Sequence, residues 1–240
     1  MVGLSVGMAI ACVVTVYVGA TVQASIGIGL GMIASPVLAL ADPDFIPAAI
    51  VIAVMPLTFA VAWADREHVE PRGVGFALLG RIPGVILGAL VVAALSDQVL
   101  ALLVAGSVQI AVVASITSRR FRPTDSALAI AGMASGFGAT TTGVGGPPMA
   151  LTYQHSDPAT MRASSSAFFA VGGVMTHAAL AIAGEIGTRQ QQLSALLRPG
   201  VILGVVTARR VRHLLDPAIV RPAVLVICTV ASIALLIETF

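Results

Sequence analysis

Two glycine-rich stretches interrupt the apolar sequence and hold the side chains best suited to bind an anion. Glycine allows an irregular backbone, proline can begin the next helical segment, and serine and threonine add hydroxyl donors. Interrupted helices in a membrane present free backbone N–H groups and the positive ends of their dipoles. The predicted substrate-binding residues of the two stretches are Ser25, Gly27, Gly29, Gly31, Ser35, Pro36, Thr140, Thr141, Thr142, Gly143, Gly145, Gly146 and Pro147. Alternatively, these small residues only allow helices to pack closely.

Arg81 is a further candidate for anion binding. It lies inside the apolar segment 74–95, about eight residues from the preceding loop, or about 12 Å along a helix at 1.5 Å per residue. A hexapeptide, Pro-Gly-Val-Ile-Leu-Gly, occurs at 83–88 and again at 199–204. Arg81 lies just before the first copy, and Arg198 lies just before the second. Two such guanidinium groups could attract anions along a pathway. Either side chain could instead snorkel to the headgroups, which is the favoured interpretation for Arg198 only.

His177 is the only histidine well inside an apolar segment. It could relay a proton in coupled transport, or it could simply hydrogen-bond to a neighbouring helix. The sequence shows no membrane carboxylate pair, no nucleophile beside a base and no His-x-x-x-His spacing, so we expect no catalytic residue, no metal site and no cofactor. Cys12 and Cys228 lie in apolar stretches and are interpreted as small buried hydrophobic residues.

The composition places the chain in a membrane. Of its 240 residues, 58% are hydrophobic and 10% are charged, and the mean hydropathy is +1.00. A soluble domain carries about a quarter charged residues, which excludes a cytosolic enzyme and a disordered chain. The 24 glycines and 13 prolines favour several closely packed, interrupted helices over a single anchor. The arginines lie in separate short loops, so nucleic acid is not an expected partner.

Apolar runs predict the elements that position these residues. The candidate segments are 4–21, 26–40, 46–64, 74–95, 99–117, 127–140, 144–153, 164–184, 193–208 and 219–236. They do not alternate polar and apolar residues, so we predict an all-α polytopic bundle of about 8–10 segments and not a barrel. Each glycine-rich stretch could be a break within one crossing, or the tip of a hairpin that crosses or half-crosses twice.

Arginine placement favours the hairpin interpretation. With two crossings at each break, ten arginines fall on one side, namely Arg66, Arg72, Arg119, Arg120, Arg122, Arg162, Arg209, Arg210, Arg212 and Arg221. If each glycine-rich stretch crosses the membrane only once, the arginines are divided almost equally between the two sides. Because short cytoplasmic loops are rich in basic residues, the sequence predicts that the arginine-rich side is cytoplasmic and that both termini lie outside.

The chain is also duplicated. The hexapeptide Pro-Gly-Val-Ile-Leu-Gly at 83–88 recurs unchanged at 199–204, and the glycine-rich stretches repeat at a similar offset. Five segments per half, an odd number, require the second half to enter the membrane from the opposite side, as in many secondary transporters. The predicted units are a first transmembrane repeat at 1–117, a cytoplasmic arginine-rich linker at 118–123 and a second transmembrane repeat at 124–240.

Four motifs occur in order along nearly the whole chain: 25–31 followed by Pro36, the Gly-Val-Gly-Gly-Pro-Pro run at 143–148, the small polar run at 162–166 and the duplicated hexapeptide. Together they resemble the sulfite exporter TauE/SafE family of membrane permeases. The resemblance implies transport of small sulfur-containing anions, such as sulfite, sulfoacetate or other organosulfonates, across the cytoplasmic membrane of prokaryotes.

The expected function is therefore secondary transport, with the anion bound between the glycine-broken helices near the bilayer midplane and access alternating between the two halves. The expected partners are the anion and the lipid bilayer, and a coupling proton or sodium ion and a homodimer stay open. An anion channel is one alternative, although it needs a continuous polar path. A non-transporting membrane subunit or assembly factor is the other.

Overall fold

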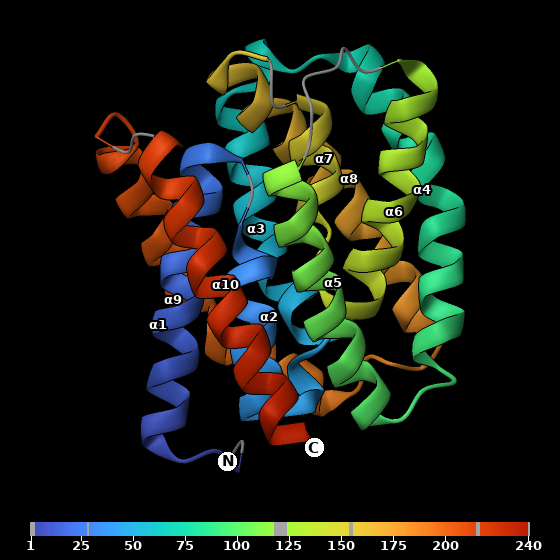
Figure 1. Cartoon of the computed structure of the whole chain (residues 1–240), viewed down its shortest axis with the longest axis vertical. Helices are drawn as coiled ribbons and strands as arrows, with labels where there is room; N and C mark the ends of the chain where they lie inside the picture. The colour runs from blue at the N-terminus through green and yellow to red at the C-terminus, as the bar shows by residue number, and fades with distance from the viewer. Residues whose placement is uncertain (1–2, 28, 118–123, 154–155, 215–216, 240) are drawn as a thin grey trace.

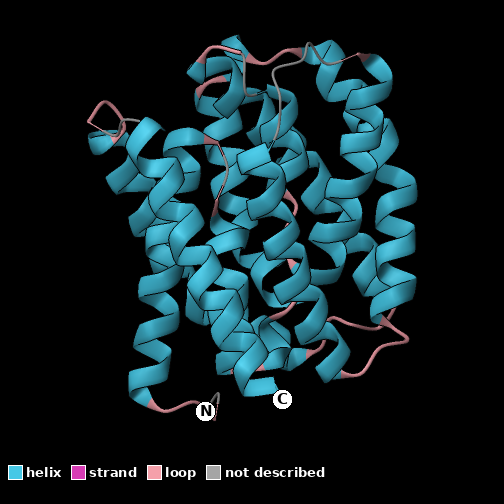
Figure 2. Cartoon of the chain, in the orientation of Figure 1, coloured by secondary structure: helices cyan, strands magenta, loops and turns pink. Residues whose placement is uncertain are grey.

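The computed structural model describes residues 3–27, 29–117, 124–153, 156–214 and 217–239. These residues form ten α-helices and two short 3-10 helices, with no strand among them (Figures 1 and 2). The elements are α1 Val6–Ile26, α2 Leu30–Ala41, η1 Pro43–Phe45, α3 Ala48–Ala64, η2 Arg66–His68, α4 Pro71–Val92, α5 Asp97–Thr117, α6 Asp125–Thr142, α7 Gly146–Tyr153, α8 Pro158–Ile182, α9 Thr188–Val211 and α10 Pro217–Thr239. The predicted all-α bundle is confirmed.

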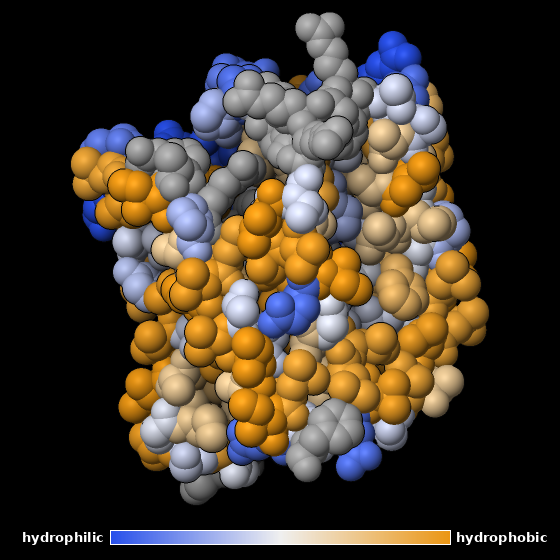
Figure 3. All heavy atoms as spheres, viewed as in Figure 1, coloured by the Kyte–Doolittle hydropathy of each residue, from blue (hydrophilic) through white to orange (hydrophobic). Residues whose placement is uncertain are grey.

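Six stretches of the described chain are long and apolar enough to cross a membrane, in α1, η1 with α3, α4, α5, α8 and α10. Large apolar side chains such as Ile10, Leu90 and Ile237 are exposed on their outer surfaces. Figure 3 shows hydrophobic residues spread over the middle of the visible face. Soluble monomers rarely expose apolar surface on this scale. The protein is therefore a multi-pass membrane protein.

Both glycine-rich stretches end one helix and begin a shorter one. Gly27 caps α1 with φ +91° and Gly143 caps α6 with φ +73°, a left-handed backbone that glycine adopts without steric cost. The following helices, α2 with 12 residues and α7 with 8, span only about 18 and 12 Å at 1.5 Å per residue. Each runs back along the helix before it (Figure 1). Both stretches are thus hairpin tips with one short arm, because a bilayer core is about 30 Å thick.

Ion pairs show which loops share an end of the bundle. Asp65, after α3, pairs with Arg162, near the start of α8, at 2.6 Å and with Arg212, after α9, at 3.6 Å. Arg72 in the first turn of α4 pairs with Asp125 at the start of α6 at 2.7 Å. We call this the arginine end, and its described arginines are Arg66, Arg72, Arg162, Arg209, Arg210 and Arg212.

The opposite end is joined by a separate set of polar contacts. Arg189, in the first turn of α9, pairs with both Asp42 and Asp44, between α2 and α3. The six described arginines of the arginine end and Arg189 thus lie at opposite ends of the bundle. This is the distribution expected if each glycine-rich stretch crosses the membrane twice. Arg119, Arg120 and Arg122 of the predicted linker 118–123, and the side chain of Arg221, lie outside what the structure describes.

Glycines of the repeated hexapeptide bring helix backbones into close approach. α4 packs along α6, and α9 packs along α1. A Cβ at Gly84 in α4 would overlap the carbonyl oxygen of Met133 in α6, and a Cβ at Gly200 in α9 would lie 2.5 Å from the carbonyl oxygen of Val13 in α1. The absence of a side chain at these positions lets the helices pack this closely.

Candidate substrate-binding site

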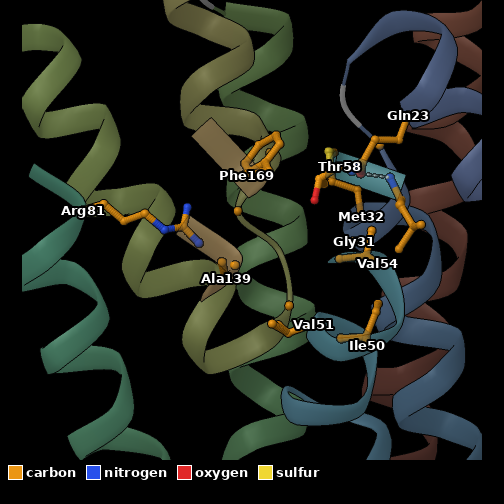
Figure 4. A pocket seen from close by; sticks show the side chains of 16 residues that line it. Gln23, Gly31, Met32, Ile50, Val51, Val54, Thr58, Arg81, Ala139 and Phe169 are labelled. Carbon is orange, nitrogen blue, oxygen red and sulfur yellow. Dashed lines mark hydrogen bonds between the residues drawn. The ribbon is translucent and has the colours of Figure 1, made fainter. Parts of the chain in front are cut away.

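A cavity of about 60 Å³ lies where the two broken helices meet (Figure 4). A Cβ at Gly31, in the first turn of α2, would overlap the carbonyl oxygen of Gly143 and lie 3.3 Å from Cα of Val144. The cavity is lined by Gln23, Gly29, Leu30, Gly31, Met32, Ile50, Val51, Val54, Thr58, Arg81, Ala139, Gly143, Gly145, Gly146, Phe169 and Gly173. We call it the central cavity.

Six of the residues predicted from the sequence reach this cavity. They are Gly29, Gly31, Arg81, Gly143, Gly145 and Gly146. Both glycine-rich stretches therefore contribute to one site, although they lie more than 100 residues apart in the chain.

The predicted hydroxyl donors mostly turn back to their own helices. Ser25 Oγ donates to the carbonyl oxygen of Thr21 at 2.7 Å. Thr141 and Thr142 lie in the last turn of α6, where their hydroxyls donate to the carbonyl oxygens of Phe137 and Gly138, both at 2.8 Å. A threonine inside a helix can bond in this way to the carbonyl four residues earlier. None of these three residues is among those that line the central cavity, and their role in anion binding stays a prediction.

The remaining predicted residues surround the site without lining it. Gly27 packs against the start of α8, since a Cβ there would lie 2.9 Å from Cα of Arg162. Ser35 and Pro36 are buried in α2, and the hydroxyl of Ser35 has no hydrogen-bond partner among the described residues. Pro147 borders a separate, apolar cavity between α5, α6 and α7.

Arg81 points into the bundle and not toward the headgroups (Figure 4). Only 2% of its surface is exposed. Its Nη1 donates to Ser135 Oγ at 3.3 Å, its Nη2 donates to Thr176 Oγ1 at 3.2 Å, and its Cζ lies 4.8 Å from the ring centroid of Phe168. Among the described residues, Nε has no hydrogen-bond partner and no carboxylate pairs with the guanidinium. The charge is thus buried with neutral partners only.

The neighbouring helices leave room for this guanidinium and connect it to the second break. A Cβ at Gly172 in α8 would overlap Nε and Cζ of Arg81, and a Cβ at Gly136 in α6 would lie 2.8 Å from Cγ of Arg81. Ser135, which accepts from Arg81, donates to the carbonyl oxygen of Gly145 at 2.5 Å. Thr140, a predicted residue that does not line the cavity, bonds to Thr176 at 3.1 Å. The backbone of the second break and Arg81 therefore belong to one hydrogen-bonded group.

The cavity also faces the amino-terminal ends of α2 and α7. Leu30, Gly31 and Met32 come from the first turn of α2, and Gly145 and Gly146 come from the start of α7. Helix N-termini carry a partial positive charge and unpaired N–H groups, which favour anions. Together with the buried charge of Arg81, they make the site electropositive. The chemistry that this arrangement supports is binding of a small anion.

Sequence reasoning missed several polar residues of the site. Gln23 accepts the N–H of Leu30 at 3.2 Å, Thr58 lines the cavity, and Ser135 and Thr176 hold Arg81. Each is a polar residue within an apolar helix. Polar residues inside membrane segments often mark a binding site, and that signal could have found them.

The other singled-out residues lie away from the cavity. His177 follows Thr176, but it does not line the cavity, and its buried Nδ1 has no hydrogen-bond partner among the described residues. Arg198 is exposed on α9. Cys12 and Cys228 are buried free thiols. Within the described part of the chain, no group of three or more His, Cys, Asp or Glu residues could hold a metal ion.

Comparison with known proteins identifies the class. The model of the family described as sulfite exporter TauE/SafE matches residues 11–235, whereas searches of curated proteins and of solved structures give no match. The match includes α2 to α9 and most of α1 and α10, and it contains both glycine-rich stretches and Arg81. The chain therefore belongs to the sulfite exporter TauE/SafE family, whose members are membrane permeases for sulfur-containing anions and not enzymes.

Proposed function

We propose that this protein is a secondary transporter that binds a small sulfur-containing anion, such as sulfite or an organosulfonate, in the central cavity. One observation carries the proposal: Arg81 is buried, lines the cavity and has no carboxylate partner among the described residues. An unpaired buried charge is costly. A bound anion would compensate it, with an attraction of about 4 kcal/mol at 4 Å separation and an effective dielectric constant of 20.

We further propose that residues 1–117 and 124–240 are inverted repeats that exchange access to the cavity. The packing supports this, because the first helix of each half packs against the fourth helix of the other, as α1 with α9 and α6 with α4. The third helices of the two halves, α3 and α8, pack together, and so do the fifth, α5 and α10. A two-fold relation between the halves generates this pattern, and rocking of one half against the other gives alternating access.

The proposed activity is tested by flux of radiolabelled sulfite into liposomes that contain the purified protein. We expect uptake that saturates with sulfite and is inhibited by competing sulfur-containing anions. Thiosulfate, sulfoacetate, taurine and sulfate, each tested as a competitor, would define the substrate. Uptake that never saturates would instead indicate a channel, and the absence of both uptake and binding would indicate a non-transporting subunit.

The arginine end is proposed to face the cytoplasm, because short cytoplasmic loops are rich in basic residues. Arg66 and Gln191 are both exposed, at opposite ends of the bundle. We expect Arg66→Cys to react with a membrane-impermeant maleimide only in inverted vesicles, and Gln191→Cys only in intact cells. The reverse labelling pattern would show the opposite orientation.

His177 is proposed as a proton relay because it is next to Thr176, a partner of Arg81, and its buried Nδ1 has no hydrogen-bond partner among the residues that the structure describes. A neutral imidazole has one nitrogen that can donate a proton and one that can accept a proton. We expect His177→Asn to abolish the acceleration of sulfite flux by a proton gradient, while exchange of labelled for unlabelled sulfite continues. If the gradient accelerates flux in the variant as in the wild type, His177 is not the relay.

A further inference from the structure

Another cavity, of about 230 Å³, opens at the arginine end between the final turns of α1, α3 and α9. Ala24, Val61 and Val205 form part of its apolar wall, and Arg209 and Arg212 contribute its positive charges. Asp65 also lines it. We call this cavity the vestibule.

The vestibule and the central cavity are neighbours along the same two helices. In α1, Gln23 lines the central cavity and Ala24 lines the vestibule. In α3, Thr58 lines the central cavity and Val61 lines the vestibule. At 1.5 Å per residue these positions are less than about 5 Å apart along the helix axes. Measured along the helix axes, the vestibule is thus within about one helical turn of the central cavity.

The vestibule carries more positive than negative charge. Asp65 has a side-chain exposure of only 12%, and it pairs with Arg162 at 2.6 Å and with Arg212 at 3.6 Å. Arg209 has no ion pair within the described residues. The lining of the vestibule therefore carries two guanidinium groups and one carboxylate, and that carboxylate is already paired with Arg162 and Arg212. A recess with this excess of positive charge concentrates anions from solution.

We propose that the vestibule is a second anion site, which holds a small oxyanion at the arginine end before it enters, or after it leaves, the central cavity. Arg209 and Arg212 bind the oxyanion there. Asp65 is an internal competitor, because its carboxylate engages Arg212 until an oxyanion takes its place. This inference rests on the proposed transport function, and it adds a second binding site to it.

The experiment counts sulfite sites by equilibrium dialysis of radiolabelled sulfite against the purified full-length protein in nanodiscs. We expect two sites per chain in the wild type. Arg209→Gln with Arg212→Gln should leave one site, Arg81→Gln should leave one, and the triple variant should leave none. Arg210→Gln is the matched control, since Arg210 is adjacent and exposed but does not line the vestibule; it should keep both sites.

The outcomes separate this inference from the proposed function. A wild type with one site that only Arg81→Gln removes would overturn the vestibule site and leave the central site intact. A single site removed only by the Arg209 and Arg212 changes would support the vestibule and count against the central cavity.

Lipid headgroups offer the same oxyanion chemistry, so the count is made in nanodiscs of phosphatidylcholine alone and with phosphatidylglycerol. Loss of the second site with phosphatidylglycerol would assign the vestibule to lipid and overturn the proposal.

Asp65→Asn tests the competitor role. The amide keeps an oxygen that Arg162 can bond to, but it removes the negative charge. We expect sulfite to bind the vestibule about tenfold more tightly than in the wild type, which corresponds to about 1.4 kcal/mol of binding free energy. Unchanged or weaker binding at this site would overturn the competitor role. If this variant does not fold, the site count for the arginine variants still decides whether the vestibule binds sulfite.

Discussion

Arg81→Gln is expected to lower sulfite flux about 100-fold in liposomes while the protein stays folded in the membrane. A hydrogen bond to a charged group contributes about 1.5 to 3 kcal/mol, and each 1.4 kcal/mol corresponds to a factor of ten in rate. Glutamine can still bond to Ser135 or Thr176, the two hydroxyl partners of Arg81, and it removes an unpaired buried charge. Folding should therefore be preserved, whereas the attraction for the anion is lost.

Two further variants give this experiment its controls. Arg198→Gln changes the arginine that precedes the second hexapeptide, which is exposed and outside the cavity, so its flux should equal that of the wild type. Arg81→Lys keeps the charge but cannot reproduce the two-armed geometry of a guanidinium, so we expect an intermediate flux. Wild-type flux in Arg81→Gln, measured on protein of normal elution in size-exclusion chromatography, would refute a role for Arg81 in anion binding.

Gly145→Leu is expected to lower flux by about 100-fold or more. A Cβ at this position would lie 2.8 Å from Cβ of Ala139 and 3.0 Å from the carbonyl oxygen of Ser135. Overpacking of this kind costs about 1 to 3 kcal/mol. Because the carbonyl oxygen of Gly145 accepts from Ser135, which in turn holds Arg81, the displacement also disturbs the guanidinium. The leucine side chain would in addition compete for space with the anion.

Gly75→Leu is the size-matched control for Gly145→Leu. A Cβ at Gly75 in α4 meets no atom within 4 Å, so the same added bulk should leave flux unchanged. Gly145→Ala, a smaller change, should give an intermediate loss, and it provides a second variant if the leucine variant does not accumulate in the membrane. Normal flux in both Gly145 variants would contradict the placement of the anion beside the second break.

The two helix breaks could be predicted from the sequence because their causes are local. A run of glycines within an apolar segment permits the left-handed backbone seen at Gly27 and Gly143. The number of apolar residues on either side of each break then limits how much of the membrane thickness a helix can cross. The duplicated hexapeptide also identifies α4 and α9 as corresponding helices of the two halves from the sequence alone. The cytoplasmic linker 118–123 and the inverted repeat stay predictions.

The position of Arg81 could not be predicted in this way. Its depth in the apolar segment allowed both snorkelling and an inward orientation, since a long side chain can extend in either direction along the helix. The inward direction depends on Gly136 and Gly172, which leave space in two other helices. Ser135 and Thr176 are recognisable as partners only once α6 and α8 are packed against α4.

The sequence by itself determined that this is an all-helical membrane protein with two broken helices, because apolar length and backbone freedom are properties of neighbouring residues. Only the tertiary structure decided that both breaks and Arg81 meet at one cavity, and that most of the predicted hydroxyls bond to their own helices instead. The physical reason is that the surroundings of a buried charge come from packing between distant segments. A single helix cannot specify which groups its neighbours will bring to that charge.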